Sequence, residues 1–137
     1  KIYFLGIKIF LDYNIFELIN AIGARDVSKA NKIVDYFDHN PKATSIIMVV
    51  SNLYNHFSRL MKIHFLRNKS KEAIASALRV HPFVAGQMLN SAQIYNPKKI
   101  AANIAILHEY DLKSKGINNS SFTHGQLMKE MTFKLMH

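Results

Sequence analysis

Seven histidines in a chain without cysteine are the side chains most able to bind a metal ion or to transfer a proton. Their spacing favours neither role. His56 and His64 lie on one predicted helix, about 12 Å apart along its axis at ~1.5 Å per residue, which is too far to hold one ion. Asp35 and His39 share a helix face, but the pattern supplies no third ligand. We therefore predict no metal site, and we interpret Asp35 and His39 as a surface pair.

A second group, His108, Glu109 and Asp111, has the residue types of acid–base catalysis, and its spacing brings His108 beside Asp111 on a helix. The same pattern is more typical of a solvated helix face. The sequence contains neither GxGxxG nor GxxxxGK[ST], the common phosphate-binding patterns, and no serine in a nucleophile-elbow motif. We predict no catalytic residue, no cofactor and no small-molecule substrate.

The composition limits the classes of protein to which this chain can belong. With 137 residues, of which 49% are hydrophobic, the chain predicts one compact domain and not a disordered segment. It has 18 Lys and Arg against 9 Asp and Glu, and the net charge of +9 favours an anionic partner such as nucleic acid. The absence of cysteine excludes disulfides and thiolate zinc sites and agrees with a reducing compartment, so we expect a cytoplasmic protein.

The most apolar stretch lies at the start of the chain, over residues 2–11. It contains Lys8 and is about half of the ~20 residues that a membrane span requires, so we expect no membrane segment. It is too continuously apolar for a surface strand and too short to judge by its period, and we expect packed structure, either strand or helix. Because the chain starts at Lys1, we expect a processed chain or a piece of a longer one.

The elements that must position these residues are helices, because from Tyr13 onward apolar residues recur every three or four positions. Candidate caps such as Asn14, Asp26 and Ser70, and prolines that follow Asn or His, mark the starts. We expect helices over residues 15–22, 27–39, 42–67, 71–80, 82–95 and 97–115, then a polar loop at 117–121 and a last helix over 122–135. The fold class is therefore all-α, a compact bundle of about six or seven helices.

Residues 70–95 resemble a helix-turn-helix, in which a short helix, a tight turn and a second helix bind DNA. Arg79 stands where a turn glycine is frequent. The second helix offers no Lys or Arg from its start, and only Gln87 and Asn90 have the side chains that read bases. A helix-turn-helix DNA-binding module stays the alternative function.

The same segment belongs to a series of motifs. The series consists of NIFELINAIGARDVSKANKIVDYF, SNLYNHFSRLMKIHFL, SKEAIASALRVHPFVAGQMLNSAQIY and HEYDLKSKGIN. It resembles the C-terminal domain of the delta subunit of bacterial DNA polymerase III, a clamp-loader subunit, from about Asn14 to the end of the chain. The specific signature is the HPF step followed by YDLKSKG. The opening IYFLGIKIFL departs from the family.

This resemblance implies a helical domain that joins the equivalent domains of the other subunits in a collar. The implied partners are the gamma/tau and delta-prime subunits of the complex that places the sliding clamp on DNA during replication. It also implies that residues 1–13 lead in from an upstream domain and that residues 14–137 form one oligomerisation domain. DNA is a further expected partner, through the complex.

Two sets of residues are candidates for these contacts. For the partner interface we predict apolar residues near the end of the chain: Phe122, Leu127, Met128, Met131 and Leu135. The methionines have a second interpretation as ordinary core, since Met fills irregular gaps in both settings. For contact with nucleic-acid phosphates we predict the lysines that flank the sixth helix: Lys98, Lys99, Lys113 and Lys115.

Overall fold

A computed structural model describes residues 13–117 and 121–137 of the chain. Over these residues it contains seven α-helices and no strand, which confirms the all-α prediction. The segment 1–12, for which the sequence left strand and helix open, lies outside the described residues. The helices are α1 (Ile15–Gly23), α2 (Val27–His39), α3 (Ile46–Phe65), α4 (Lys71–Leu78), α5 (Pro82–Ile94), α6 (Pro97–Ser114) and α7 (His124–Met136).

Side-chain caps explain where the helices begin. In α1 the Asn14 side chain accepts a hydrogen bond from the Glu17 amide, and the Glu17 carboxylate accepts one from the Asn14 amide, so two free donors are satisfied at once. Thr123 and Gln126 repeat this arrangement at the start of α7. The predicted caps at Asp26 and Ser70 are confirmed, and Asn96 caps α6.

Two predicted helix starts are wrong. The third helix begins at Ile46, not at residue 42, because Ser45 accepts a hydrogen bond from the Met48 amide and caps the helix there. The last helix begins at His124, so Phe122 lies outside it, before the Thr123 cap. In both cases a capping hydroxyl, rather than an apolar side chain, decides the boundary.

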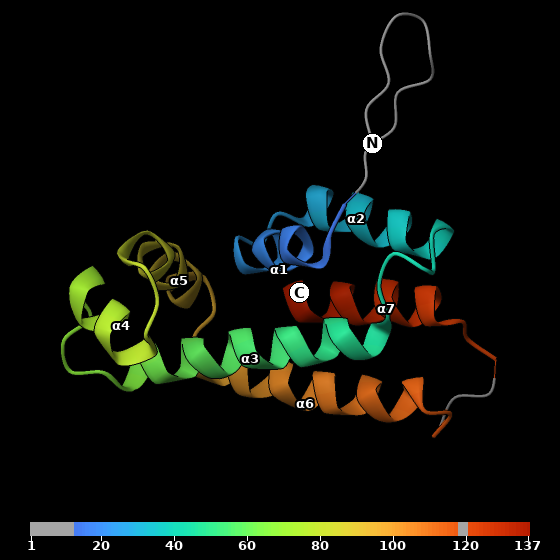
Figure 1. The fold of residues 1–137 in the computed structure, drawn as a ribbon. Coiled ribbons are helices and arrows are strands. Elements are labelled where there is room, and N and C mark those ends of the chain that lie inside the picture. The colour runs from blue at the N-terminus through green and yellow to red at the C-terminus, as the bar shows by residue number, and fades with distance from the viewer. Residues whose placement is uncertain (1–12, 118–120) are drawn as a thin grey trace, which may run out of the picture.

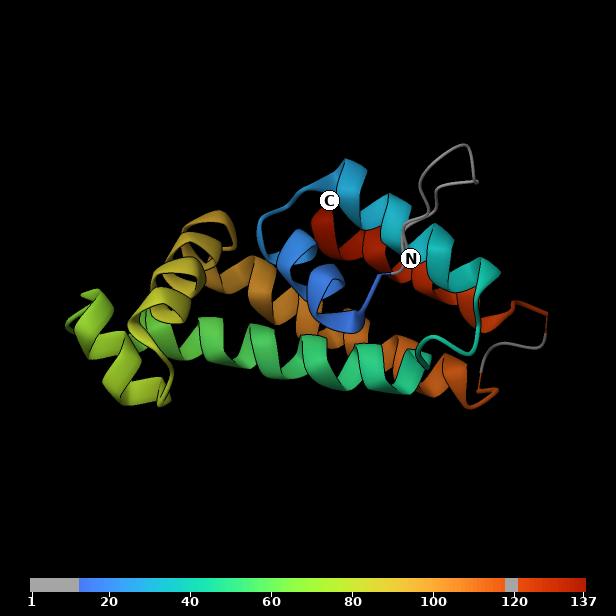
Figure 2. The same cartoon turned by 45° about the horizontal axis from the view of Figure 1, so that its top comes forward.

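The helices form two layers and an end unit (Figures 1 and 2). The two longest helices, α3 and α6, pack side by side and antiparallel in one layer. Helices α1, α2 and α7 form the second layer, in which α7 packs against both α2 and α6. The pair α4 and α5 packs together beyond the end of α3. No helix among the described residues is both long and apolar enough to cross a membrane.

Tyr95 joins the end unit to both layers. Its side chain is fully buried, and its hydroxyl donates a hydrogen bond of 2.6 Å to the carbonyl of Ile22 at the end of α1. Its ring meets the Phe57 ring of α3 edge-on, with centroids 5.1 Å apart. The Arg25 guanidinium lies 4.9 Å from the Tyr95 ring centroid. One aromatic residue thus joins the ends of α1 and α5 to the interior of α3.

Helices α2 and α7 approach closely because Gly125 has no side chain. A Cβ atom at Gly125 would lie 3.0 Å from the Asp38 Cα atom, which is backbone and cannot turn aside. Beside this contact the Lys129 ammonium lies 3.0 Å from the Asp38 carboxylate and 3.3 Å from that of Asp35. The close contact and the ion pairs fix α7 on α2, and with it the whole second layer.

Candidate functional site

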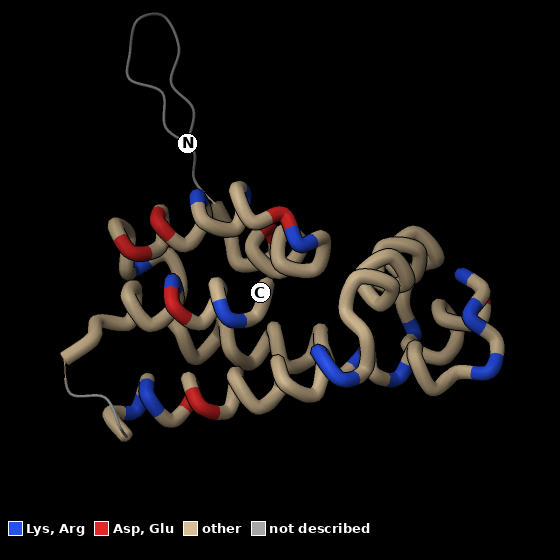
Figure 3. The backbone as a smooth tube through the Cα atoms, turned by 180° about the vertical axis from the view of Figure 1, so that it is seen from behind, with Lys and Arg blue, Asp and Glu red and all other residues tan. Residues whose placement is uncertain are grey.

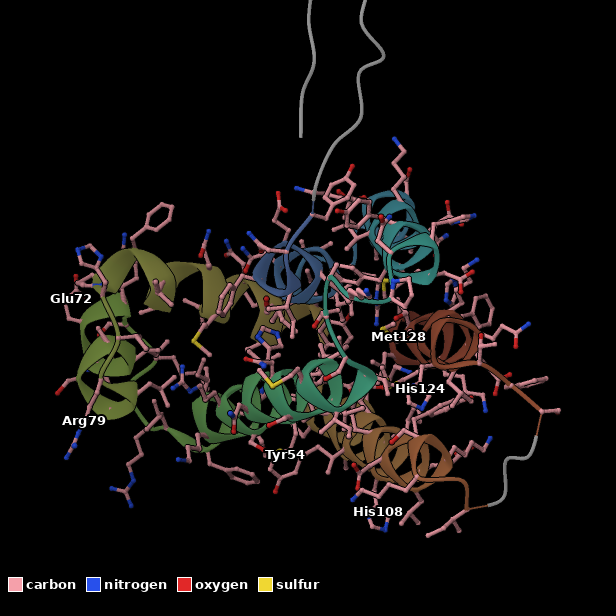
Figure 4. The ribbon with its side chains drawn as sticks, turned by 45° about the vertical axis from the view of Figure 1, so that its right-hand side comes forward. Tyr54, Glu72, Arg79, His108, His124 and Met128 are labelled. Carbon is pink, nitrogen blue, oxygen red and sulfur yellow. The ribbon has the colours of Figure 1, made fainter. Side chains whose placement is uncertain are left out.

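A largely apolar hollow, open to solvent, lies between α3 and α6, and we call it the α3–α6 groove. It has a volume of about 490 Å³ and is lined by Ile47, Val50, Ser51, Tyr54, Ile104, Leu107, His108 and Asp111. Ile47 and Tyr54 are seven residues apart, two turns of α3, and therefore share one face. They are 52% and 51% exposed. Tyr54 of α3 and His108 of α6 lie on the same side of the two helices (Figure 4).

Polar groups line the groove beside its apolar side chains. Ser51, His108 and Asp111 are the polar members of the lining. The Asp111 carboxylate forms an ion pair of 3.1 Å with Lys115, one turn further along α6. Protein–protein interfaces combine apolar and polar side chains in the same way. The α3–α6 groove therefore has the chemistry of a docking face.

A network of charges at the α6–α7 contact keeps α6 in place. Lys113 lies 2.8 Å from Glu109, and Lys134 of α7 lies 3.8 Å from the same carboxylate. The hydrogen bond from Lys113 is the main cause that lowers the pKa of Glu109. Burial, followed by a hydrogen bond to Glu130, raises the pKa of Tyr110, whose hydroxyl donates to that carboxylate. The carboxylate of Glu109 is thus paired with two lysines.

Four of the five predicted interface residues lie in the core of this chain. Leu127, Met128, Met131 and Leu135 are at most 3% exposed and belong to the main hydrophobic cluster. A partner cannot contact these side chains on the surface of the domain as it stands. Phe122 is 50% exposed and remains a candidate contact.

The predicted phosphate contacts on α6 are largely engaged within the chain. Lys113 and Lys115 form the ion pairs just described, and the Lys99 ammonium donates a hydrogen bond of 3.0 Å to the Lys134 carbonyl. Burial, followed by repulsion from Arg25, lowers the pKa of Lys99. Lys98 is exposed. The structure does not bring the four lysines together as one free cationic face.

The helix-turn-helix alternative meets a geometric difficulty. Arg79 adopts a left-handed conformation (φ 56°, ψ 51°) at the end of α4, so the turn forms without a glycine. However, Gln87 and Asn90 line a hollow of about 470 Å³ whose other walls are α1 and α3. Both side chains are exposed, but DNA that reached them would also have to fit against α1 and α3.

His56 of α3 lines this second hollow. Its Nε2 atom is buried and has no hydrogen-bond partner among the described residues. Burial, followed by the charge of Arg59, lowers the pKa of His56 to about 4. Gly23 makes room for the ring, since a Cβ there would lie 3.1 Å from Nε2. His56 is thus neutral near pH 7 and unsuited to acid–base catalysis at that pH.

The other histidines with candidate chemistry lie apart from His56. His64 donates from Nε2 to the Tyr95 carbonyl at 2.8 Å, a structural hydrogen bond. Asp35 and His39 form an exposed pair on α2, 3.7 Å apart, as the sequence predicts. Over the described ranges no three His, Asp or Glu side chains gather in a group that could hold a metal ion.

Ile47 and Tyr54 are not among the residues predicted for the partner interface. Both belong to the broad apolar face of α3, which demands several neighbours. The structure covers Leu53 and Phe57 completely and leaves Ile47 and Tyr54 half exposed. The width of the apolar arc was the available signal, because it exceeds what one neighbouring helix covers.

Comparison with known proteins agrees with this architecture. The family model described as the C-terminal domain of the DNA polymerase III delta subunit matches residues 12–136. The fold is similar to that of the Bacillus subtilis DNA clamp loader delta protein YqeN, with a TM-score of 0.65 and 25% sequence identity over 90% of this chain and 35% of that one. The chain thus spans about a third of the solved relative. No curated protein matches its sequence. The chain belongs to the family formed by the C-terminal domains of DNA polymerase III delta subunits.

Proposed function

We propose that residues 14–137 are the oligomerisation domain, or collar domain, of a bacterial clamp-loader delta subunit. In this role the domain holds delta in the complex that places the sliding clamp on DNA during replication. Its partners are the equivalent domains of the gamma/tau and delta-prime subunits. The role is one of assembly, and it requires no catalytic group, cofactor or small-molecule substrate from this chain.

The α3–α6 groove is the observation that carries this proposal. It lies on the two longest helices, whose extensive mutual packing fixes its walls relative to each other. A preformed groove loses little conformational freedom on binding, which favours a stable contact. Ile47 and Tyr54 are half exposed and line the groove, and a partner that covers such apolar and aromatic side chains gains binding energy. Family membership supports a clamp-loader partner for this surface.

The test is sedimentation velocity of this chain, alone and mixed with the gamma/tau and delta-prime collar domains at micromolar concentration. We expect the mixture to form a heteromer. The double variant Ile47→Glu/Tyr54→Glu should weaken assembly at least tenfold, because two carboxylates would have to be desolvated in the groove.

The matched control places the same two charges elsewhere. Phe16→Glu/Phe133→Glu replaces side chains that are 66% and 59% exposed and that do not line the α3–α6 groove. The control should assemble like the unmodified chain. A folded chain that stays monomeric in the mixture would refute the proposed function. Equal losses of assembly in both double variants would show that the α3–α6 groove is not the interface.

A further inference from the structure

The two ends of the molecule differ in charge. Between Asp38 and Glu109 the sequence holds nine Lys and Arg and a single acidic residue, Glu72. Six of these nine cations occur in the short stretch from the last turns of α3 to the end of α4: Arg59, Lys62, Arg67, Lys69, Lys71 and Arg79. Figure 3 shows blue segments gathered at this end, whereas red segments lie mainly over α1, α2, α6 and α7. We call this end the basic end.

The cations of the basic end are exposed and lack carboxylate partners. Lys62, Arg67 and Arg79 are solvent-exposed, and none forms an ion pair with a described residue. Arg79 projects away from the body of the domain (Figure 4). The lysines of the opposite end behave differently, since Lys113 and Lys129 contact carboxylates within 3.0 Å. The positive potential is therefore concentrated at the basic end.

An exposed aromatic ring lies among these cations. Phe65, in the last turn of α3, is 79% exposed, the largest value for any large apolar side chain of the described residues. It lines a shallow hollow of about 380 Å³ together with Lys62 and with Ala77 and Leu78 of α4. Arg67 and Arg79 each follow directly after a residue that lines this hollow. A flat ring thus lies open to solvent in a hollow that Lys62 also lines, with Arg67 and Arg79 each one residue beyond the lining.

We propose that the basic end binds single-stranded nucleic acid, with Lys62, Arg67 and Arg79 on the phosphates and Phe65 under a base. Free cations neutralise successive phosphates, and an exposed aromatic ring stacks on an unpaired base of any sequence. A duplex buries its base faces and would leave the Phe65 ring without a contact. The proposal is independent of the α3–α6 groove and of any collar assembly.

The test is a fluorescence-anisotropy titration of the chain with a labelled dT20 oligonucleotide at several salt concentrations. The variant Lys62→Gln/Arg67→Gln/Arg79→Gln should bind at least tenfold more weakly at about 50 mM salt. It should also lower the slope of log K against log salt by about 2, since each phosphate contact on a single strand contributes about 0.7. Phe65→Ala should weaken binding about fivefold, the effect of losing one stacked base.

A control variant that has the same net charge as the basic-end triple variant tests whether the position of the lost charges, and not only their number, decides the affinity. Lys29→Gln/Lys32→Gln/Lys42→Gln removes three exposed lysines from α2 and the turn that follows it, and it should change affinity less than threefold. Circular dichroism should give all variants the helix content of the unmodified chain. Equal weakening by both triple variants would overturn the assignment to the basic end.

Two further ligands test the identity of the polyanion. A 20-base-pair duplex should bind more weakly than dT20, and its binding should not respond to Phe65→Ala. Equal affinity for both forms, together with no effect of Phe65→Ala on dT20, would overturn the single-strand assignment. Vesicles with 30% phosphatidylserine should not sediment the chain at about 150 mM salt. Binding to these vesicles but not to dT20 would show that the surface recognises lipid and would overturn the proposal.

Discussion

Tyr95→Ala is expected to lower the free energy of unfolding by about 3–5 kcal/mol. The substitution removes a fully buried ring that contacts Phe57, and it leaves a cavity where α1, α3 and α5 meet. It also leaves the Ile22 carbonyl without its side-chain donor. Because the ring connects the end unit to both layers, loss of it affects all three helices together.

Urea unfolding followed by circular dichroism measures this effect, and Tyr95→Phe separates its two causes. The phenylalanine variant keeps the ring and loses only the hydroxyl, so it should cost about 1–2 kcal/mol. A loss below about 1 kcal/mol for Tyr95→Ala would contradict the junction role of this residue. Equal losses in the two variants would show that the hydrogen bond, and not the packed ring, carries the effect.

The stability of the domain should fall by about 2 kcal/mol between pH 7 and pH 5 because of His56 alone. In the unfolded chain this side chain gains a proton near its ordinary pKa of 6.5, whereas burial holds the pKa in the folded chain at about 4. Between these values only the unfolded state takes up the proton, so lowering the pH favours unfolding. The contribution is complete above pH 6.5 and is lost progressively as the pH falls towards 4.

The measurement is urea unfolding of the chain and of His56→Leu at pH 7 and pH 5. Leucine cannot titrate, so the variant should lose less stability across this interval than the unmodified chain, by about 2 kcal/mol. Asn55→Leu, which changes a side chain of the same hollow without removing a titratable group, is the control and should leave the pH dependence unchanged. If His56→Leu shows the full pH dependence, the buried neutral imidazole is not its cause.

The helices could be predicted closely from the sequence because their signals are local. A cap such as Asn14 satisfies amides within three residues of itself, and apolar residues at helical spacing mark the buried face. The prediction failed at residue 42, where a proline after an asparagine imitates a helix start. Ser45 is the true cap. The hydrogen bond that its hydroxyl accepts from the Met48 amide distinguishes this start from the one expected after Pro41.

The surfaces could not be predicted in the same way, because periodicity finds apolar faces without saying what covers them. Met128 and Tyr54 have similar apolar signals, yet α7 turns Met128 into the core while Tyr54 stays half exposed on α3. The lysines show the same limit for charge. Neither Lys129 nor Lys62 has an acidic residue three or four positions away, but the fold brings Asp38 to Lys129 and gives Lys62 no carboxylate partner among the described residues.

The sequence by itself determined the all-α class, the order of the helices and most of their caps, and its motif series indicated the family that comparison confirmed. These properties depend on residues a few positions apart, or on sequence motifs that can be recognised without a structure. The fold was needed to show which apolar residues of α3 and α6 form the groove, and which lysines pair with distant carboxylates and which stay exposed. These properties depend on contacts between helices far apart in the chain, such as α3 with α6 and Asp38 with Lys129, and no local spacing specifies such contacts.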